Sequence, residues 1–259
     1  MNYARNLAGK SIWITGGAGY LGSAITRALD AEAAQVVCFD LPGKAEALVR
    51  EHNLKRTIPV TLDVNDADTL PAALDQAIAD HGLPDGVTHL AFSSSSGYRL
   101  EDLPAEVFQN TFSRSLAPTF VLCRALAEKM KVRGSGNIVL FSSMYGLVSP
   151  DPRIYVDPMI PNPIDYGASK AALLQMTRYL AVHYGPANLR FNAITPGPFP
   201  PAAVQDANPK FTADLRAKTA LNRLGFNEEI VGPTMFLLSD SASYVTGHSL
   251  VVDGGWTSW

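Results

Sequence analysis

Tyr166 and Lys170 have the residue types and the spacing needed for proton transfer. They stand near the start of the most helix-like segment, 164–184, where Asp165 is a candidate N-cap, and a spacing of four places both side chains on one helix face. A phenol is a poor acid or base at neutral pH because its unperturbed pKa is about 10. A neighbouring ammonium stabilises the phenolate and lowers that pKa, so the pair predicts a proton donor and acceptor.

The pair is accompanied by polar residues and tight turns elsewhere in the chain. Ser143 follows an apolar segment in the run Ser142-Ser143-Met144-Tyr145-Gly146 and supplies a hydroxyl upstream of Tyr166. Downstream, LRFNAITPG (189–197) ends in a Pro-Gly turn, and YVTGHSLVVDGG (244–255) precedes the end of the sequence. The spacing Tyr-x-x-x-Lys alone is common on solvated helices, and these companions favour a functional interpretation.

A glycine-rich turn near the start of the chain indicates a dinucleotide site. Thr15-Gly16-Gly17-Ala18-Gly19-Tyr20-Leu21-Gly22 follows an apolar run and opens a helical pattern, so the backbone can approach a pyrophosphate at a helix N-terminus. Asp40 ends the next apolar run, where a carboxylate accepts hydrogen bonds from a ribose 2′-hydroxyl. Because a 2′-phosphate would be repelled by Asp40, NAD is favoured over NADP. We therefore expect cofactor contacts at Gly16, Gly19, Tyr20, Leu21, Gly22 and Asp40.

A third acidic position, Asp63, is followed by Val64 at the end of another strand-like run. This pair is a candidate contact for the adenine edge of the cofactor. The alternative is that Asp63 caps its own loop, which aspartate does often.

Composition and charge exclude several other functions. The net charge of −3 gives no field for nucleic acid or an anionic membrane surface, and we predict neither partner. Two distant cysteines and scattered histidines provide neither a disulfide framework nor a metal site, so no metal is expected. No signal core or membrane span is apparent, which predicts a soluble, cytoplasmic protein. Neither a nucleophile elbow nor a phosphate-binding P-loop motif occurs.

The elements that must position these residues alternate along the whole chain of 259 residues. Because continuous apolar strands separated by helices are typical of a parallel sheet covered on both faces, we predict an α/β fold without a domain-splitting linker. Strand patterns lie at 11–15, 35–39, 58–62, 87–92, 137–141, 189–194 and 249–252, and helical patterns at 21–33, 69–79, 105–131 and 164–184.

Two proline-rich segments interrupt this alternation, and we expect them to form substrate-pocket loops at 147–165 and 195–220. The first holds five prolines between 147 and 165, and four more fall between 195 and 208. Loops of such length in a compact domain are commonly binding loops, and proline makes them stiff. Arg153, Tyr155 and Met159 are candidates for substrate contact, with a surface loop or a subunit contact as the alternative.

Taken together, these motifs resemble the short-chain dehydrogenase/reductase family over nearly the whole length, from Gly9-Lys10 to Asp253-Gly254-Gly255. The resemblance implies one Rossmann domain over residues 1–259, with a doubly wound, mostly parallel sheet of seven strands and helices on both faces. It implies that Tyr166 is the proton donor and acceptor, that Lys170 lowers the Tyr166 pKa and binds the nicotinamide ribose, and that Ser143 polarises a substrate carbonyl. Pro196, Gly197 and the backbone near Phe199 would hold the nicotinamide carboxamide.

The chain departs from the family pattern in the stretch FSSSSG (92–97). Phe92-Ser93-Ser94-Ser95 occupies the slot in which the family has Asn-Asn-Ala-Gly after the fourth strand. This placement implies that Phe92 lies at the cofactor and that Ser94 and Ser95, with Tyr145, face the substrate.

Further departures lie in the glycine turn, the catalytic tetrad and the first loop. Tyr20 replaces a glycine usual in the glycine turn, and Ser115 aligns with the asparagine of the tetrad, which makes Ser115 the fourth candidate catalytic residue. A serine is shorter than asparagine, so the family's proton relay through water to Lys170 is put in question. Ser143 and Tyr166 are 23 residues apart, a longer separation than the family usually shows.

The predicted function is an NAD-dependent oxidoreductase that interconverts a secondary alcohol and a ketone on a small, hydroxylated, sugar-like or polyol-like substrate. A catalytically impaired NAD-binding sensor or scaffold is the second hypothesis, because of the missing asparagines. The glycine turn also resembles that of nucleotide-sugar epimerases and dehydratases, although too few residues follow Pro196 for their substrate domain. We expect a homo-oligomer, as the family forms dimers and tetramers.

Overall fold

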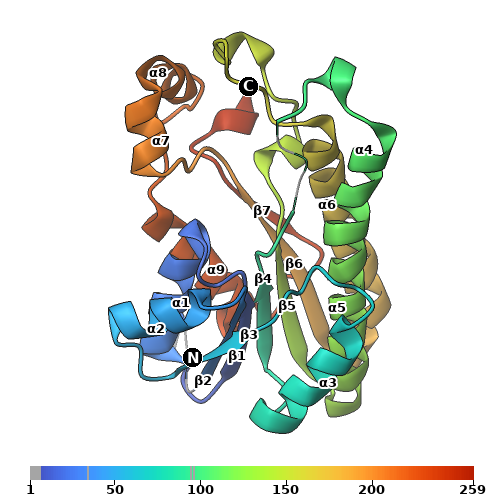
Figure 1. Cartoon of the computed structure of the whole chain (residues 1–259). Coiled ribbons are helices and arrows are strands. Elements are labelled where there is room, and N and C mark those ends of the chain that lie inside the picture. The colour runs from blue at the N-terminus through green and yellow to red at the C-terminus, as the bar shows by residue number, and fades with distance from the viewer. Residues whose placement is uncertain (1–6, 34, 94, 96) are drawn as a thin grey trace.

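One seven-stranded parallel sheet forms the centre of the molecule (Figure 1). The computed structural model describes residues 7–33, 35–93, 95 and 97–259. The strand order β3-β2-β1-β4-β5-β6-β7 reverses direction between β1 and β4, as in a doubly wound Rossmann sheet. The strands are β1 (Ser11–Thr15), β2 (Gln35–Asp40), β3 (Thr57–Thr61), β4 (Gly86–His89), β5 (Gly136–Phe141), β6 (Leu189–Pro196) and β7 (Ser249–Val252).

Helices cover both faces of this sheet (Figure 1). Apolar side chains of α3, α5 and α6 pack on one face with Trp13 and Phe191, while those of α1, α2 and α9 pack on the other with Ile12 and Ile194. This arrangement confirms the predicted fold class. The helices are α1 (Tyr20–Glu32), α2 (Lys44–His52), α3 (Leu70–His81), α4 (Ala105–Thr111), α5 (Ala117–Arg133), α6 (Ile164–Tyr184), α7 (Ala202–Ala207), α8 (Pro209–Ala217) and α9 (Val231–Leu238).

The structure corrects several predicted boundaries. The helix expected over 105–131 is interrupted by a π-helical turn, Phe112–Leu116, which separates α4 from α5. The segment 195–220 is not a continuous loop, since α7 and α8 lie within it, and α2 and α9 were not predicted. The fourth strand ends at His89 and not at Phe92.

The segment 147–165 is irregular, as predicted, apart from a short 3-10 turn at Pro152–Ile154 and the first residues of α6. No helix in the described part of the chain has the combined length and hydropathy of a membrane span.

Candidate active site

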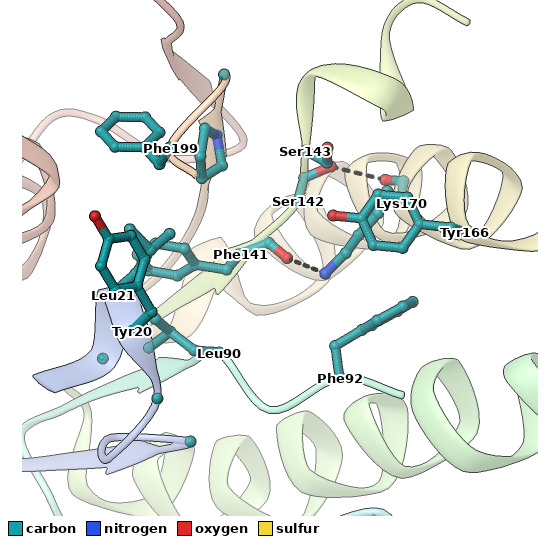
Figure 2. Close-up of a pocket in the computed structure, with 15 residues that line it drawn as sticks. Tyr20, Leu21, Leu90, Phe92, Phe141, Ser142, Ser143, Tyr166, Lys170 and Phe199 are labelled. Atoms are coloured by element: carbon teal, nitrogen blue, oxygen red, sulfur yellow. Dashed lines mark hydrogen bonds between the residues drawn. The ribbon is translucent and has the colours of Figure 1, made fainter. Parts of the chain in front are cut away.

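A cavity of about 360 Å³ lies at the carboxyl ends of β1, β4, β5 and β6, where the strand order reverses (Figure 2). Ligands of doubly wound sheets bind at this edge because the loops after neighbouring strands diverge there. Residues from five separate stretches of the chain line it: Gly16, Gly19, Tyr20, Leu21, Gly22, Leu90, Phe92, Phe141, Ser142, Ser143, Tyr166, Lys170, Pro196, Gly197 and Phe199.

The glycine turn forms one wall of this cavity from its main chain. Gly16 has φ +69° and its N–H donates to the carbonyl of Phe39 over 2.8 Å. A Cβ on Gly16 would lie 2.9 Å from the nitrogen of Ala91, and one on Gly22 would lie 2.2 Å from the carbonyl oxygen of Gly16. Only glycine fits at these two positions, and the backbone is left exposed to a ligand. This cradle fits the pyrophosphate of a dinucleotide at the start of α1.

Asp40 lies beside the glycine turn at the end of β2. One carboxylate oxygen accepts from the N–H of Ala18 at 2.8 Å, and the other accepts from the N–H of Leu41 at 2.8 Å. No lysine or arginine forms an ion pair with Asp40 in the described residues. The local charge therefore suits a ribose diol and opposes a 2′-phosphate.

Asp63 and Val64 lie outside the lining of the cavity. Asp63 accepts from the N–H of Asn65 at 3.0 Å, as a loop-capping aspartate does, and Val64 is buried in the hydrophobic core. The alternative interpretation of Asp63 as a loop cap is therefore found in the structure, and an adenine contact stays a prediction.

The second turn of the site, Pro196-Gly197, is held between β6 and the last strand. The N–H of Gly197 donates to the carbonyl of Val252 at 2.9 Å, and a Cβ on Gly197 would lie 2.4 Å from the Cα of Asp253. This close packing fixes the main chain of the turn. Phe199 follows it and lines the cavity opposite Tyr20 and Leu21 (Figure 2).

Tyr166, Lys170 and Ser143 meet in the same cavity (Figure 2). Lys170 is buried, its Nζ donates to the carbonyl of Phe141 at 2.8 Å, and Nζ lies 5.7 Å from the centre of the Tyr166 ring. Ser142 secures the helix that carries this pair, because its Oγ donates to the carbonyl of Lys170 at 2.9 Å. Ser143 accepts from the N–H of Tyr145 at 3.2 Å. A phenol, an ammonium and a hydroxyl thus face one space.

Burial controls the ionisation of both groups of the pair. It lowers the pKa of Lys170 to about 7, since the charged amine loses its hydration. It raises the pKa of Tyr166, and a hydrogen bond with Ser143 acts in the opposite direction without cancelling that rise. Lys170 is not among the causes of this shift, and the lowering of the Tyr166 pKa by the Lys170 charge stays a prediction.

The chain was then compared with known proteins. Residues 17–257 match the family described as "Enoyl-(Acyl carrier protein) reductase". An NAD-dependent glycerol dehydrogenase of Listeria innocua is 27% identical, over 97% of this chain and 95% of that protein. A D-arabinitol 2-dehydrogenase (ribulose-forming) of Candida tropicalis is 27% identical, over 98% of this chain and 94% of that protein.

Solved structures agree with these sequence matches. A short-chain dehydrogenase from Leptospira borgpetersenii with bound NAD⁺ superimposes with a TM-score of 0.86 at 29% identity, covering 99% of this chain and 96% of the other. The chain belongs to the short-chain dehydrogenase/reductase family. It is accordingly an enzyme of the oxidoreductase class, as the resemblance implies.

The segment that leads into the serine run leaves the sheet earlier than predicted. β4 ends at His89, and Leu90 and Phe92 of the segment after it line the cavity. Phe92 lies at the predicted site, with its ring 5.4 Å from that of Tyr166. The position of Ser94 lies outside the described residues.

Ser95 does not face the cavity, contrary to prediction. Its Oγ donates to the Asp165 carboxylate at 2.6 Å, and its N–H lies 3.2 Å from the same carboxylate. Asp165 is also not the N-cap of α6, which is Pro163, but a fully buried helical residue that accepts from the Thr111 hydroxyl. Polar groups of three segments meet at this carboxylate, so the strap 93–95 is tied to α6 and α4.

Ser115 likewise lies outside the lining of the cavity. Its Oγ donates to the Ser93 carbonyl at 2.5 Å and accepts from the Ser93 N–H at 2.9 Å, so both of its hydrogen-bonding functions are used on one residue. The structure thus gives this serine of the π-helical turn a positioning contact with the strap after β4, and no contact with Lys170 is found among the described hydrogen bonds.

The segment 147–165 brings Tyr155 close to the site, but not Arg153. The Tyr145 and Tyr155 hydroxyls lie 3.1 Å apart, and both residues pack in one cluster with Tyr166 and Trp256. Arg153 is paired with Asp151 at 2.8 Å on the surface. Met159 is half-buried and does not line the cavity.

Leu90, Phe141 and Ser142 line the cavity without having been predicted. Each stands at the end of a strand or directly after one, and the rule that parallel sheets bind ligands at their carboxyl ends identifies such positions. The burial and the hydrogen-bond partners of His89 and Asp165 were not predicted. Nothing in the local sequence marks a buried polar residue whose partners come from distant segments.

Proposed function

We propose that this enzyme interconverts a secondary alcohol and a ketone on a small, hydroxylated substrate, with NAD as the cofactor and Tyr166 as the general acid and base. The observation that carries the proposal is the meeting of Tyr166, Lys170 and Ser143 in one cavity with the glycine turn. The names of the two dehydrogenases reported above, one for glycerol and one for the conversion of arabinitol to ribulose, agree with this reaction.

The residues present fit NAD. The Gly16–Gly22 turn would hold the pyrophosphate and Asp40 the adenosine ribose, while Asp63 and Val64 would border the adenine. Pro196, Gly197 and Phe199 would hold the nicotinamide, with Phe92 and Lys170 on its ribose side. When bound, the nicotinamide supplies the hydride acceptor or donor. The bound cofactor in the Leptospira borgpetersenii relative supports the assignment.

In the proposed reaction the chain's own groups handle the proton and the developing charge. For oxidation, Tyr166 takes the hydroxyl proton of the substrate, and for reduction it returns a proton to the carbonyl oxygen. Ser143 donates a hydrogen bond to the same substrate oxygen. Protonated Lys170 stabilises the phenolate form of Tyr166 by its charge.

The substrate class rests on the polar groups that pack beside Tyr166, outside the lining of the cavity itself. Tyr145 and Tyr155 present paired hydroxyls, and the Nδ2 of Asn162 donates to the Tyr155 hydroxyl at 3.3 Å. Such groups suit the further hydroxyls of a polyol or a sugar better than an apolar chain. Ser95 and Arg153 are turned away and are not part of this proposal.

The test is a Tyr166→Phe variant with Tyr244→Phe as its matched control. Tyr244 is fully exposed and lies outside the lining of the cavity, so its variant should keep full activity. NADH formation is followed with glycerol, pentitols, aldoses and a steroid alcohol, with NADP as the alternative cofactor. We expect the Tyr166→Phe rate to fall by about a hundredfold or more, the usual contribution of a general base.

Three outcomes would contradict the proposal. Unchanged turnover in the Tyr166→Phe variant removes the role of the tyrosine. NAD binding without turnover of any compound in the panel favours the sensor hypothesis, which Ser115 in place of asparagine motivates. Turnover of a nucleotide sugar without net NADH favours an epimerase.

We also propose a cytoplasmic homo-oligomer. Tyr179 and Val182 on the outer side of α6 are 68% and 80% exposed, which suits a contact between subunits. Cys38 and Cys123 are free buried thiols, and burial raises the pKa of each to about 12, as is compatible with a reducing compartment. Analytical ultracentrifugation of the purified protein tests the assembly. Sedimentation as a monomer would contradict the proposal.

A further inference from the structure

The ring of Phe92 touches both members of the catalytic pair. The Nζ of Lys170 lies 3.8 Å from the centre of this ring, within the range of a cation–π contact. The rings of Phe92 and Tyr166 are 5.4 Å apart with an interplanar angle of 89°, so they meet edge to face. Figure 2 shows Phe92 and Tyr166 on the same side of the cavity, with the Lys170 amine directed between Phe141 and Tyr166.

Lys170 has few other partners for its charge. The side chain is 4% exposed, and the carbonyl of Phe141 accepts the hydrogen bond that Nζ donates. No carboxylate pairs with Lys170 in the described part of the chain. An ammonium has three hydrogens, so the negative face of the Phe92 ring stands where a buried lysine would otherwise need an acid or water.

The chain holds the Phe92 ring in this place through the residues that follow it. Ser93 is clamped through its N–H and its carbonyl by the Oγ of Ser115, at 2.9 and 2.5 Å. Ser95 is clamped by the buried carboxylate of Asp165. Ser93 and Ser95 are therefore both held by distant segments, and these contacts restrain the backbone directly after the Phe92 ring.

We propose that Phe92 is a positioning residue that holds the Lys170 ammonium beside Tyr166 through a cation–π contact. It acts through Lys170 and not on the substrate. The inference rests on the proposed function, because it concerns the same tyrosine–lysine pair.

The other titratable groups around Lys170 do not pair with its ammonium, so the Phe92 ring is the group that stabilises it. On its own helix these are Tyr166 and Asp165, and the Asp165 carboxylate is engaged by Ser95 and Thr111. From β4 comes His89, and burial, together with the charge of Lys170, lowers the His89 pKa to about 3, so it stays neutral. From the turn after β5 comes Tyr145, whose pKa burial raises. None of these forms an ion pair with the amine in the described part of the chain.

The first arm of the test measures the Lys170 amine itself in the cofactor-free protein. Carbon-13 at Cε of lysine reports protonation by NMR, and the Lys170 signal is identified by its absence in Lys170→Met. We expect the titration midpoint to fall by about one pH unit in Phe92→Leu, which removes the π face, and to stay in place in Phe92→Tyr. Phe199→Leu is the control, because Phe199 lines the same cavity without a contact to Lys170 (Figure 2).

The second arm measures the pH dependence of NAD reduction with the best alcohol of the panel. Weaker retention of the ammonium makes the phenolate less stable. The acidic limb of kcat/KM, on which Tyr166 loses its proton, should therefore move to higher pH in Phe92→Leu, with a loss of about tenfold near neutrality. Phe92→Tyr should retain the parent profile.

Either arm can overturn the proposal. A Lys170 midpoint in Phe92→Leu that is unchanged or higher than that of the parent contradicts it. If Phe92→Leu does not fold by circular dichroism, Phe92→Met gives the same comparison with a flexible side chain. Failure of the proposed function appears separately, as unchanged turnover in Tyr166→Phe, whereas a dead Tyr166→Phe with a parent-like Phe92→Leu rejects this inference alone.

Discussion

Among single residues, Gly22 shows how tightly the cofactor side of the site is packed. The carbonyl oxygen of Gly16 stands 2.2 Å from the place where a Cβ on Gly22 would lie, and the neighbouring Gly17 Cα is 2.9 Å away. Both neighbours are main-chain atoms, which cannot rotate aside. A methyl group at this position must move the glycine turn or the first turn of α1.

The Gly22→Ala variant should therefore be destabilised and should bind NAD weakly. We expect a loss of about 1–3 kcal/mol in the free energy of unfolding, the usual cost of overpacking. Gly185→Ala is the matched control, because nothing lies within 4 Å of its Cβ position, and its change should stay within about 0.5 kcal/mol. Urea unfolding and NADH fluorescence measure the two effects, and equal stabilities of the two variants would contradict the packing argument.

Site residues whose partners are close in sequence could be predicted, and others could not. Tyr166 with Lys170 and the Gly16–Gly22 turn follow from local spacing, which a helix or a strand–helix turn converts directly into geometry. Ser95 was assigned to the substrate from its place in the family pattern, and no local feature of the sequence indicates that its hydroxyl turns to Asp165. The partners of Ser95 come from α4 and α6, far along the chain.

At the scale of elements, the buried start of α6 determines where Tyr166 lies. Asp165 precedes the tyrosine and is 0% exposed. Its carboxylate lies within hydrogen-bond distance of the Ser95 hydroxyl, the Ser95 N–H and the Thr111 hydroxyl. The two oxygens of the Asp165 carboxylate thus have three donors around them. These contacts join α6 to α4 and to the strap after β4.

The Asp165→Asn variant keeps the volume of the side chain and changes its hydrogen bonding, so it tests the role of the hydrogen bonds at this junction. The amide has almost the same volume, but its NH₂ group faces donors, so at least one buried polar group loses its partner. We expect a loss of about 1–3 kcal/mol in the free energy of unfolding. Asp68→Asn at an exposed position is the control and should change it by less than about 0.5 kcal/mol. An Asp165→Asn variant as stable as the parent in thermal and urea unfolding would refute this role.

Elements were predictable where their apolar pattern was continuous and less so elsewhere. The helical pattern at 164–184 coincides with α6, and the strand at 249–252 coincides with β7. The helix α2 was missed because it is short and only Ala45 and Leu48 of its residues are buried, so it carries few apolar positions. The break between α4 and α5 is a π-helical turn inside an unbroken helical pattern, and the turn contains Ser115, whose contact with Ser93 comes from a distant segment.

In the molecule as a whole, a chain of hydrogen bonds crosses the core beneath the site. The Thr119 hydroxyl donates to the carbonyl of Ser115 at 2.6 Å, so it accepts from the Nε2–H of His89 at 2.9 Å. The Nδ1 of His89 is then the acceptor for the Thr15 hydroxyl at 2.6 Å. This direction requires a neutral imidazole, in agreement with a His89 pKa of about 3.

His89 should make the fold sensitive to acid. Its pKa is about 3 in the folded state against 6.5 as the ordinary value, so only the unfolded chain takes up the proton between these values. Stability is therefore lost as the pH falls through this window, by at most about 1.4 kcal/mol per pH unit. In His89→Gln the difference in the free energy of unfolding between about pH 7 and about pH 5 should be smaller by about 2 kcal/mol.

Urea titrations at the two pH values measure this difference. The same substitution at the exposed His52 serves as the control. A parent and a His89→Gln variant that lose equal stability on acidification would show that the buried imidazole is not the acid-sensitive group.

The surroundings of the cavity are main chain on one side and side chains on the other. On the cofactor side they are main chain, with no space for one more carbon at Gly16 beside Ala91 or at Gly197 beside Asp253. Beyond Tyr166, side chains of an irregular segment and of short helices pack in one cluster, among them Tyr155, which packs on Phe211. Point substitutions can reshape this cluster more easily than the main chain of the two glycine turns. Substitutions in these side chains can therefore change which substrate fits, while the surface that binds the cofactor stays the same.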